Sequence, residues 1–140
     1  MKTILFVCTG NTCRSPMAEV LCNKMLSEAG VTDIKALSAG LAVAEGVPAS
    51  QNAICAVGEL STDLSAHVSR QVTREMIADC DAVYAMTGSH AAMLKKAFPE
   101  FAEKISVLGD GIPDPYGGDI EVYRSCRDNI LEALKKLKNR

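Results

Sequence analysis

Residues 6–19 read FVCTGNTCRSPMAE, and this order of residue types indicates a strand, a tight loop and a helix. The apolar run at residues 4–7 is short and continuous, as in strands that are covered on both faces of a parallel sheet. The run stops at Cys8, and a helical pattern of apolar residues begins around Ser15 and Pro16, which favour a helix start. The small residues between have little to bury, so we expect them to have a role other than packing.

The rest of the chain continues this alternation of strands and helices. After the first strand and a helix at 14–29, the patterns predict strands at 34–38, 81–86 and 105–108 and helices at 49–60, 73–78, 89–98 and 120–138. They predict an α/β fold, a single domain over residues 1–140 with a doubly wound four-stranded parallel sheet and helices on both faces. Ligands of such sheets bind at the carboxyl ends of the strands, where the loop after the first strand lies.

The last predicted helix has one apolar stripe that we expect to face the protein interior. Its members recur at helical spacing and are Val122, Cys126, Ile130, Leu134 and Leu137. The basic residues at its end suit the negative end of the helix dipole.

Charge and hydropathy exclude several classes of protein. With 15 basic and 17 acidic residues the net charge is −2, so we expect no nucleic-acid partner and no membrane surface. No segment approaches the ~20 apolar residues of a membrane span, and the apolar run in MKTILFVC is too short for a signal peptide. We therefore expect a soluble, cytoplasmic protein that acts as a monomer.

The six cysteines are scattered, with no CxxC pair and no cluster of cysteine and histidine. A chain of 140 residues buries enough apolar surface to fold without disulfides. We therefore expect free thiols in a reducing compartment, no metal site and no cofactor.

The loop after the first strand has the pattern C-x5-R-S, from Cys8 to Ser15. A turn between strand and helix whose amides point inward forms a concave anion site, aided by the positive end of the helix. Gly10 lets the backbone come close to the anion, and Asn11 tolerates a left-handed conformation. The phosphate-binding residues that we predict are Thr9, Gly10, Asn11, Thr12, Cys13, Arg14 and Ser15. The nucleotide P-loop is excluded because no Gly-Lys-Ser/Thr follows.

A cysteine at the floor of such a loop is predicted to be a nucleophile. The loop amides, the helix start and Arg14 all favour the thiolate of Cys8 over the thiol, and the planar fork of Arg14 suits two phosphoryl oxygens. Ser15 is expected to donate its hydroxyl to the sulfur. The alternative is that Cys8 is a small buried apolar residue and Arg14 forms a surface ion pair, but their spacing between a strand and a helix favours catalysis.

Residues 7–19, VCTGNTCRSPMAE, resemble the N-terminal signature of the low-molecular-weight protein tyrosine phosphatases. In their two threonines they are most similar to the bacterial protein arginine phosphatase branch of that family. The resemblance continues through Ser38–Gly40 (SAG), Ala66–Gln71 (AHVSRQ) and Asp114–Gly118 (DPYGG). It implies that Asn11, Ser38 and His67 brace the loop by hydrogen bonds.

Asp114 is the predicted general acid, a role that a phosphoryl leaving group requires. It lies in a loop rich in proline and glycine after the fourth strand, where aspartate also commonly begins a turn. The resemblance to the family's DP loop favours the catalytic role, and Asp110 is the second choice. The predicted mechanism has two displacements through a cysteinyl-phosphate.

The predicted substrates are phosphorylated proteins, with phosphoarginine favoured over phosphotyrosine. Tyrosine-specific relatives carry bulky aliphatic residues where this chain has Thr9 and Thr12, and the hydroxyl of Thr12 can orient polar groups. Tyr116 is expected to form a wall against either planar side chain. Arsenate reduction is less favoured because Met86 and Thr87 occupy the region where further thiols would act, and a non-catalytic phosphoprotein-binding module would be expected to lose Cys8 or Asp114.

Two further expectations concern residues near the loop. Cys13 is near enough in sequence to form a disulfide with Cys8, which predicts a reversible redox switch, although a buried thiol that packs under the loop is an equal alternative. His90 is predicted to be a surface residue at a helix start.

Overall fold

The computed structural model describes residues 1–138 of the chain. These residues form an α/β fold around a parallel sheet of four strands. The order across the sheet is β2-β1-β3-β4, and all three pairings are parallel. The predicted α/β fold is confirmed. The strands are β1 (Lys2–Cys8), β2 (Ile34–Gly40), β3 (Ala82–Ala85) and β4 (Ile105–Val107).

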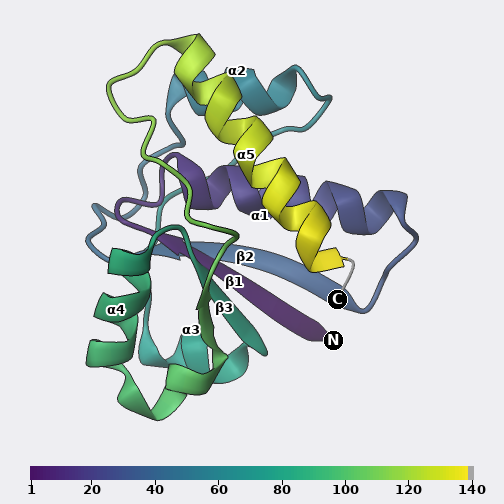
Figure 1. Cartoon of the computed structure of the whole chain (residues 1–140). Helices are drawn as coiled ribbons and strands as arrows, with labels where there is room; N and C mark the ends of the chain where they lie inside the picture. The colour runs from purple at the N-terminus through teal and green to yellow at the C-terminus, as the bar shows by residue number, and fades with distance from the viewer. Residues whose placement is uncertain (139–140) are drawn as a thin grey trace.

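Helices cover both faces of the sheet, as Figure 1 shows: α1, α2 and α5 lie on one side, and α3 and α4 lie on the other. The α-helices are α1 (Arg14–Glu28), α2 (Gln51–Gly58), α3 (Arg74–Asp79), α4 (Gly88–Ala97) and α5 (Ile120–Lys138). Pro99 stops α4 as predicted, but it also begins a 3₁₀ helix, η1 (Pro99–Lys104), that the sequence patterns did not predict.

Alternation along β1 explains why the sheet has an apolar core on each face. Leu5 and Val7 belong to the core beneath α3 and α4, whereas Phe6 belongs to the core beneath α1 and α5. All three are at most 1% exposed, because successive side chains of a strand point to opposite faces. The same alternation turns Cys8 toward the α1 side.

Four helices begin at a side chain that caps them. The capping residues are Ser50, Thr73, Thr87 and Asp119, which accept hydrogen bonds from the backbone amides of Ala53, Met76, His90 and Val122 at the starts of α2, α3, α4 and α5. Such caps satisfy amides that have no partner within the helix. By contrast, α1 begins at the loop after β1 without a side-chain cap.

One predicted member of the α5 stripe faces outward. Val122 is 44% exposed, whereas Tyr123 is 4% exposed and joins Cys126 and Ile130 in the core. The buried set at positions 123, 126, 130 and 134 follows the helical period, and residue 122 lies at the edge of this stripe rather than at its centre. Val122 instead packs over Gly118, where an added Cβ would come within 2.7 Å of it.

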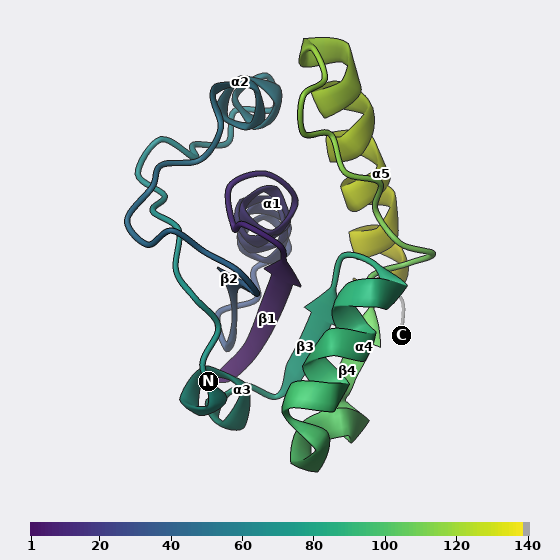
Figure 2. The ribbon, with the colours of Figure 1, turned by 90° about the vertical axis from the view of Figure 1, so that its left-hand side faces the viewer.

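The carboxyl ends of the strands lead into the loops that carry most of the predicted functional residues. Figure 2 shows the loop between β1 and α1 at the tip of the β1 arrow, with α4 and the chain leading into α5 beside it. Within residues 1–138, none of the helices combines the length and apolar character that crossing a bilayer requires.

Candidate active site

A cavity of about 290 Å³ opens at the carboxyl end of β1. Its walls come from the loop after β1, from the start of α1 and from the segment between β4 and α5. The lining residues are Cys8, Thr9, Gly10, Thr12, Cys13, Arg14, Asp114 and Tyr116. The structure therefore brings the predicted nucleophile together with the predicted acid and the predicted substrate wall, which both lie more than 100 positions later in the sequence.

The start of α1 makes the floor of this cavity a binding site for an anion. The first backbone amides of the helix have no capping side chain, and the positive end of the helix dipole lies there. Residues Cys13 and Arg14 at this end line the cavity, and no acidic side chain lies in the first turn of α1. A phosphoryl group in the cavity would thus take the position that a capping side chain occupies in the other helices.

Behind the floor, Asn11 holds the loop in shape. Its φ of 57° is left-handed, as predicted, and its side chain is fully buried. The backbone N–H of Arg70 donates to Asn11 Oδ1, with the nitrogen 3.0 Å from the oxygen. Because a backbone N–H only donates, this contact assigns the orientation of the Asn11 amide. Nδ2 therefore donates to Ser15 Oγ at 2.9 Å and to Ser38 Oγ at 3.0 Å.

This orientation fixes what Ser15 can offer to Cys8. Ser15 Oγ accepts from Asn11, and its own proton has two acceptors within reach, Cys8 Sγ at 2.8 Å and the carbonyl oxygen of Ala39 at 3.4 Å, of which the sulfur is the nearer. A hydroxyl that donates to the sulfur stabilises a thiolate more strongly than a thiol, because hydrogen bonds to an ionised partner are the stronger ones. The Ser38 hydroxyl donates a hydrogen bond to Glu19 Oε1 at 2.7 Å.

His67 contacts the same loop from the segment between α2 and α3. Its Nε2 lies 2.8 Å from the carbonyl oxygen of Asn11. A carbonyl only accepts, so this ring nitrogen carries a proton. Ser38 and His67 thus both contact Asn11, in the positions where the family resemblance suggested bracing residues.

The SAG motif ends in Gly40, the last residue of β2, where there is no room for a side chain. A Cβ at this position would lie 2.6 Å from the carbonyl oxygen of Thr9 and 3.0 Å from the amide nitrogen of Asn11. Real Cβ atoms essentially never come so close to backbone, so only glycine lets β2 pack against the loop. By comparison, a Cβ at Gly10 would meet only Thr12 Oγ1, at 3.8 Å.

Arg14 joins the loop to the segment after β4. Its side chain is nearly buried; Nη1 donates to the carbonyl oxygen of Ile112 at 2.9 Å, and Nη2 lies 3.8 Å from Asp114 Oδ2. Asp110, the second choice for the acid, lines a different cavity together with Glu132 and Lys136. Of the two carboxylates, Asp114 is therefore the one that lines the same cavity as the nucleophile.

Cys13 lines the cavity but also has partners beneath the loop. Its Sγ lies 3.5 Å from Ser50 Oγ and 3.4 Å from the hydroxyl of Tyr123. Burial and the contact with Cys13 raise the pKa of Tyr123 to about 12, so its hydroxyl stays protonated. All six cysteines of the chain are unpaired thiols, and within residues 1–138 no cluster of side chains suited to a metal ion is found.

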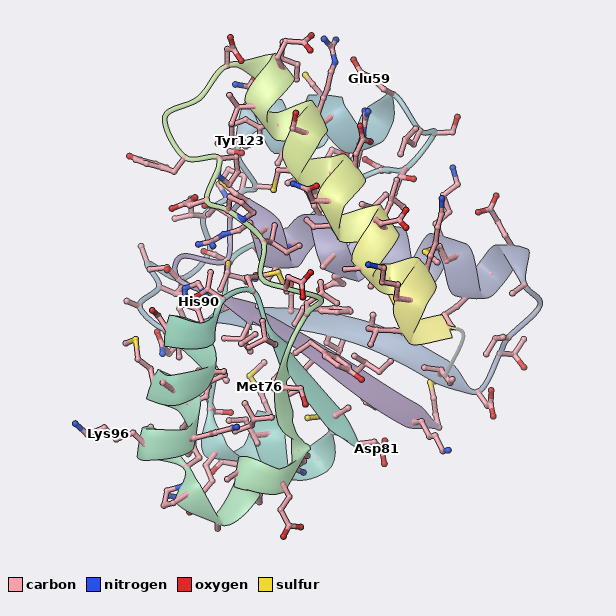
Figure 3. The ribbon with its side chains drawn as sticks, viewed as in Figure 1. Glu59, Met76, Asp81, His90, Lys96 and Tyr123 are labelled. Atoms are coloured by element: carbon pink, nitrogen blue, oxygen red, sulfur yellow. The ribbon has the colours of Figure 1, made fainter. Side chains whose placement is uncertain are left out.

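The prediction that His90 lies at a helix start is confirmed, but the prediction that it lies on the surface was wrong. His90 is 7% exposed, and its Nε2 lies 2.8 Å from Thr9 Oγ1 in the loop after β1. Figure 3 shows it at the end of α4 nearest to that loop. Burial, and then the positive charge of Arg14, lower the pKa of His90, so its ring is neutral at pH 7. Sequence patterns reveal the start of α4 but carry no signal for a contact across 81 positions.

Comparisons with known proteins identify relatives over nearly the whole chain. The family model for low molecular weight phosphotyrosine protein phosphatase matches residues 3–140. The protein-arginine-phosphatase of Geobacillus stearothermophilus is 42% identical over 142 residues, which covers 96% of this chain and 92% of that protein.

Two solved structures extend the similarity to the whole fold. The low molecular weight protein tyrosine phosphatase of T. tengcongensis has a TM-score of 0.94 at 37% identity and covers 99% of both chains. A mutant of the arginine phosphatase YwlE, which carries a phosphorylated active-site serine, has a TM-score of 0.93 at 35% identity and covers 98% of this chain and 93% of its own. The chain therefore belongs to the low-molecular-weight phosphotyrosine protein phosphatase family.

Proposed function

We propose that this protein is a phosphatase that removes phosphoryl groups from phosphoarginine in proteins. The observation that carries the proposal is the composition of one cavity: the Cys8 sulfur lies 2.8 Å from Ser15 Oγ, and Arg14 and Asp114 form another part of the wall. A nucleophile, an anion clamp and a proton donor are the three parts that phosphoryl transfer without a metal requires.

In the first displacement, the Cys8 thiolate attacks phosphorus in line with the bond to the substrate nitrogen. The sulfur–phosphorus bond forms as the phosphorus–nitrogen bond breaks, and Asp114 in its acid form gives its proton to the departing guanidine. Negative charge on the phosphoryl oxygens is stabilised by the loop amides and by the guanidinium of Arg14.

In the second displacement, Asp114 is a carboxylate and accepts a proton from water. The water oxygen attacks phosphorus, the sulfur–phosphorus bond breaks, and inorganic phosphate forms. The Ser15 hydroxyl stabilises the sulfur as it leaves with its negative charge. The phosphorylated active-site serine of the YwlE mutant supports a covalent phosphoryl-enzyme in this family.

The polar wall of the cavity favours phosphoarginine. Thr9 and Thr12 offer hydroxyl groups where a flat apolar ring would prefer aliphatic contacts, and Asp114 can pair with a guanidinium. The arginine phosphatase of Geobacillus stearothermophilus is a relative of high coverage.

Phosphotyrosine is the second candidate substrate. Tyr116 is 82% exposed and forms part of the cavity wall, where it can stack on an aromatic ring. The relative from T. tengcongensis bears the name of a tyrosine phosphatase.

Two other functions have less support. Arsenate reduction by a thiol relay would need further cysteines near the cavity after β3, but Met86 and Thr87 follow that strand and Cys80, before it, bonds the carbonyl oxygen of Ile77. A module that only binds phosphoproteins would not need the Cys8–Ser15 contact or an acid over the site.

We also propose that Cys13 protects the nucleophile from irreversible oxidation. An oxidant such as peroxide would convert Cys8 to a sulfenic acid, and the Cys13 thiol would then form a disulfide with it and release water. Both thiols line the same cavity. The six unpaired thiols support action in a reducing compartment such as the cytoplasm, and nothing in the proposed chemistry requires a second subunit.

The test compares kcat/KM for a phosphoarginine peptide and a matched phosphotyrosine peptide. We expect the wild type to prefer phosphoarginine and Thr12→Ile to shift the preference by ~10-fold or more toward phosphotyrosine, since one hydroxyl contact is lost and apolar surface is gained. Thr12→Val, which keeps the size of threonine, separates the hydroxyl from the added bulk. The substrate assignment fails if Thr12→Ile leaves the preference unchanged, and turnover by Cys8→Ser would remove the thiolate mechanism.

A further inference from the structure

His90 is a buried histidine whose two ring nitrogens are both occupied at the edge of the active site. Nε2 lies 2.8 Å from Thr9 Oγ1, and Nδ1 lies 3.0 Å from Thr87 Oγ1. Thr9 is exposed and lines the cavity, whereas His90 is 7% exposed. The side chain of Thr9 is therefore held from behind by a residue of α4 that the mechanism above does not use.

The contact is more than a consequence of capping α4. The cap is made by the backbone amide of His90, which donates to Thr87 Oγ1 at 3.2 Å, and any residue except proline at position 90 would supply that amide. The imidazole adds a separate connection, from the start of α4 to the residue that follows the nucleophile.

The held hydroxyl keeps an acceptor for the substrate whichever ring nitrogen carries the proton. A hydroxyl oxygen has one proton and two lone pairs. If Nε2 donates to Thr9, one lone pair and the proton remain; if Nε2 accepts from Thr9, both lone pairs remain. In either tautomer Thr9 Oγ1 can accept an N–H from a group in the cavity.

We propose that His90 is a positioning residue for substrate selection, which holds the Thr9 hydroxyl at the cavity wall so that its oxygen accepts an N–H of the phosphoarginine guanidinium. This inference rests on the proposed function. Phosphotyrosine offers no N–H next to its phosphate, so the contact favours one substrate over the other. When bound phosphotyrosine covers the Thr9 oxygen without offering it a donor, that substrate binds worse.

The charge of the site agrees with this role. The charged groups that act on His90 are Arg14, whose effect lowers the pKa of His90, and Asp114, whose effect raises it. Burial is the largest cause of the lowered pKa of His90, ahead of Arg14, and the net result is a neutral ring. A neutral ring does not repel a positively charged guanidinium in the cavity.

The experiment is a double-mutant cycle on the selectivity, defined as kcat/KM for the phosphoarginine peptide divided by kcat/KM for the phosphotyrosine peptide. Thr9→Val removes the hydroxyl at constant shape, and His90→Leu removes its support. We expect each variant to lower the selectivity by roughly tenfold or more, the worth of one hydrogen bond whose donor is charged. The double variant should lower it no further than Thr9→Val alone, because His90 acts through Thr9.

Two more variants separate positioning from a general structural effect. His90→Gln puts an amide nitrogen within reach of Thr9 Oγ1, and we expect it to keep most of the selectivity that His90→Leu loses. Ser89→Ala changes the exposed neighbour on α4 and should leave the selectivity unchanged. Thermal unfolding of each variant checks the fold, and Thr9→Val, at an exposed position, tests the proposal even if His90→Leu is unstable.

The possible failures are distinguishable. A wild type that prefers phosphotyrosine overturns the proposed function and this inference with it. A wild type that prefers phosphoarginine, together with a Thr9→Val variant of unchanged selectivity, overturns this inference alone. Additive effects in the double variant overturn the claim that His90 acts through Thr9.

Discussion

The two oxygens of the Asp114 carboxylate have different neighbours. Oδ1 accepts the backbone amide of Tyr116 at 3.0 Å, and Oδ2 lies 3.8 Å from Arg14 Nη2. The first contact is the turn that aspartate often makes before proline, and the second directs the same side chain at the active site. The structural and catalytic interpretations of Asp114 are therefore compatible, because one carboxylate has enough lone pairs for both.

Asp114→Asn should separate these two contacts. The amide oxygen can still accept from Tyr116, so the turn should persist, but the side chain can no longer transfer a proton. We expect kcat for a phosphoarginine peptide to fall by roughly 10²- to 10⁴-fold. The loss should be smaller for p-nitrophenyl phosphate, whose leaving group needs little protonation.

Asp110→Asn is the matched control, because Asp110 lines the other cavity. Its kcat should equal that of the wild type. The assignment of the acid would be reversed if Asp110→Asn, rather than Asp114→Asn, lost activity in a leaving-group-dependent way.

At the scale of elements, the site depends on how closely β2 approaches the loop after β1. The amide of Leu41 bonds the carbonyl oxygen of Cys8, and the amide of Ala42 bonds that of Thr9, each at 3.0 Å. Gly40 ends β2 and directly precedes Leu41 and Ala42. The loop is thus shaped from behind by its neighbour in the sheet as much as by its own sequence.

Gly40→Ala should displace the loop, because its Cβ would meet backbone atoms that cannot rotate away. We expect kcat/KM to fall by roughly 10²-fold, the effect of misplacing catalytic groups by about 1 Å, together with a lower Tm. Gly58→Ala is the control: nothing lies within 4 Å of its Cβ, and alanine in place of glycine favours a helix. A Gly40→Ala enzyme of normal activity and Tm would contradict this account of the SAG motif.

At the scale of the whole molecule, an ion-pair network joins the two outer helices on the α1 side of the sheet. Glu59, at the end of α2, accepts from Arg124 Nη2 at 2.6 Å and from Arg127 Nη1 at 2.7 Å. Figure 3 shows Glu59 close to the end of α5 that also carries Tyr123. Hydrogen bonds from Arg124, and then from Arg127, lower the pKa of Glu59 to about 2.

This shift predicts how stability depends on pH. A carboxylate with a lowered pKa in the folded state stabilises the fold above its ordinary pKa and loses that contribution as the pH falls toward 2. Glu59→Gln should therefore have a lower Tm than the wild type at pH 7, and the difference should shrink between about pH 4.5 and pH 2. Salt should also reduce it, since these side chains are partly exposed.

Thermal unfolding of wild type, Glu59→Gln and Glu132→Gln over this pH range is the measurement. Glu132 is an exposed carboxylate of α5, and its replacement should change Tm little at any pH. A Tm difference for Glu59→Gln that does not depend on pH would show that the network is held by packing rather than by charge.

Local patterns in the chain were sufficient for the strands, the helices and the composition of the loop from Cys8 to Ser15, because periodicity, helix starts and turn residues act over a few neighbours. The left-handed Asn11 is of this kind. The orientation of Val122 was missed because the packing of α5 selects which face of its first turn is buried.

Only the tertiary structure shows which residues from distant segments of the chain meet at the active site. Asp114 rather than Asp110 lines the same cavity as Cys8, and His90 lies behind Thr9 rather than in solvent. Both outcomes depend on where parallel strands end and how the following loops and helices pack, and neither leaves a trace in the spacing of neighbouring residues.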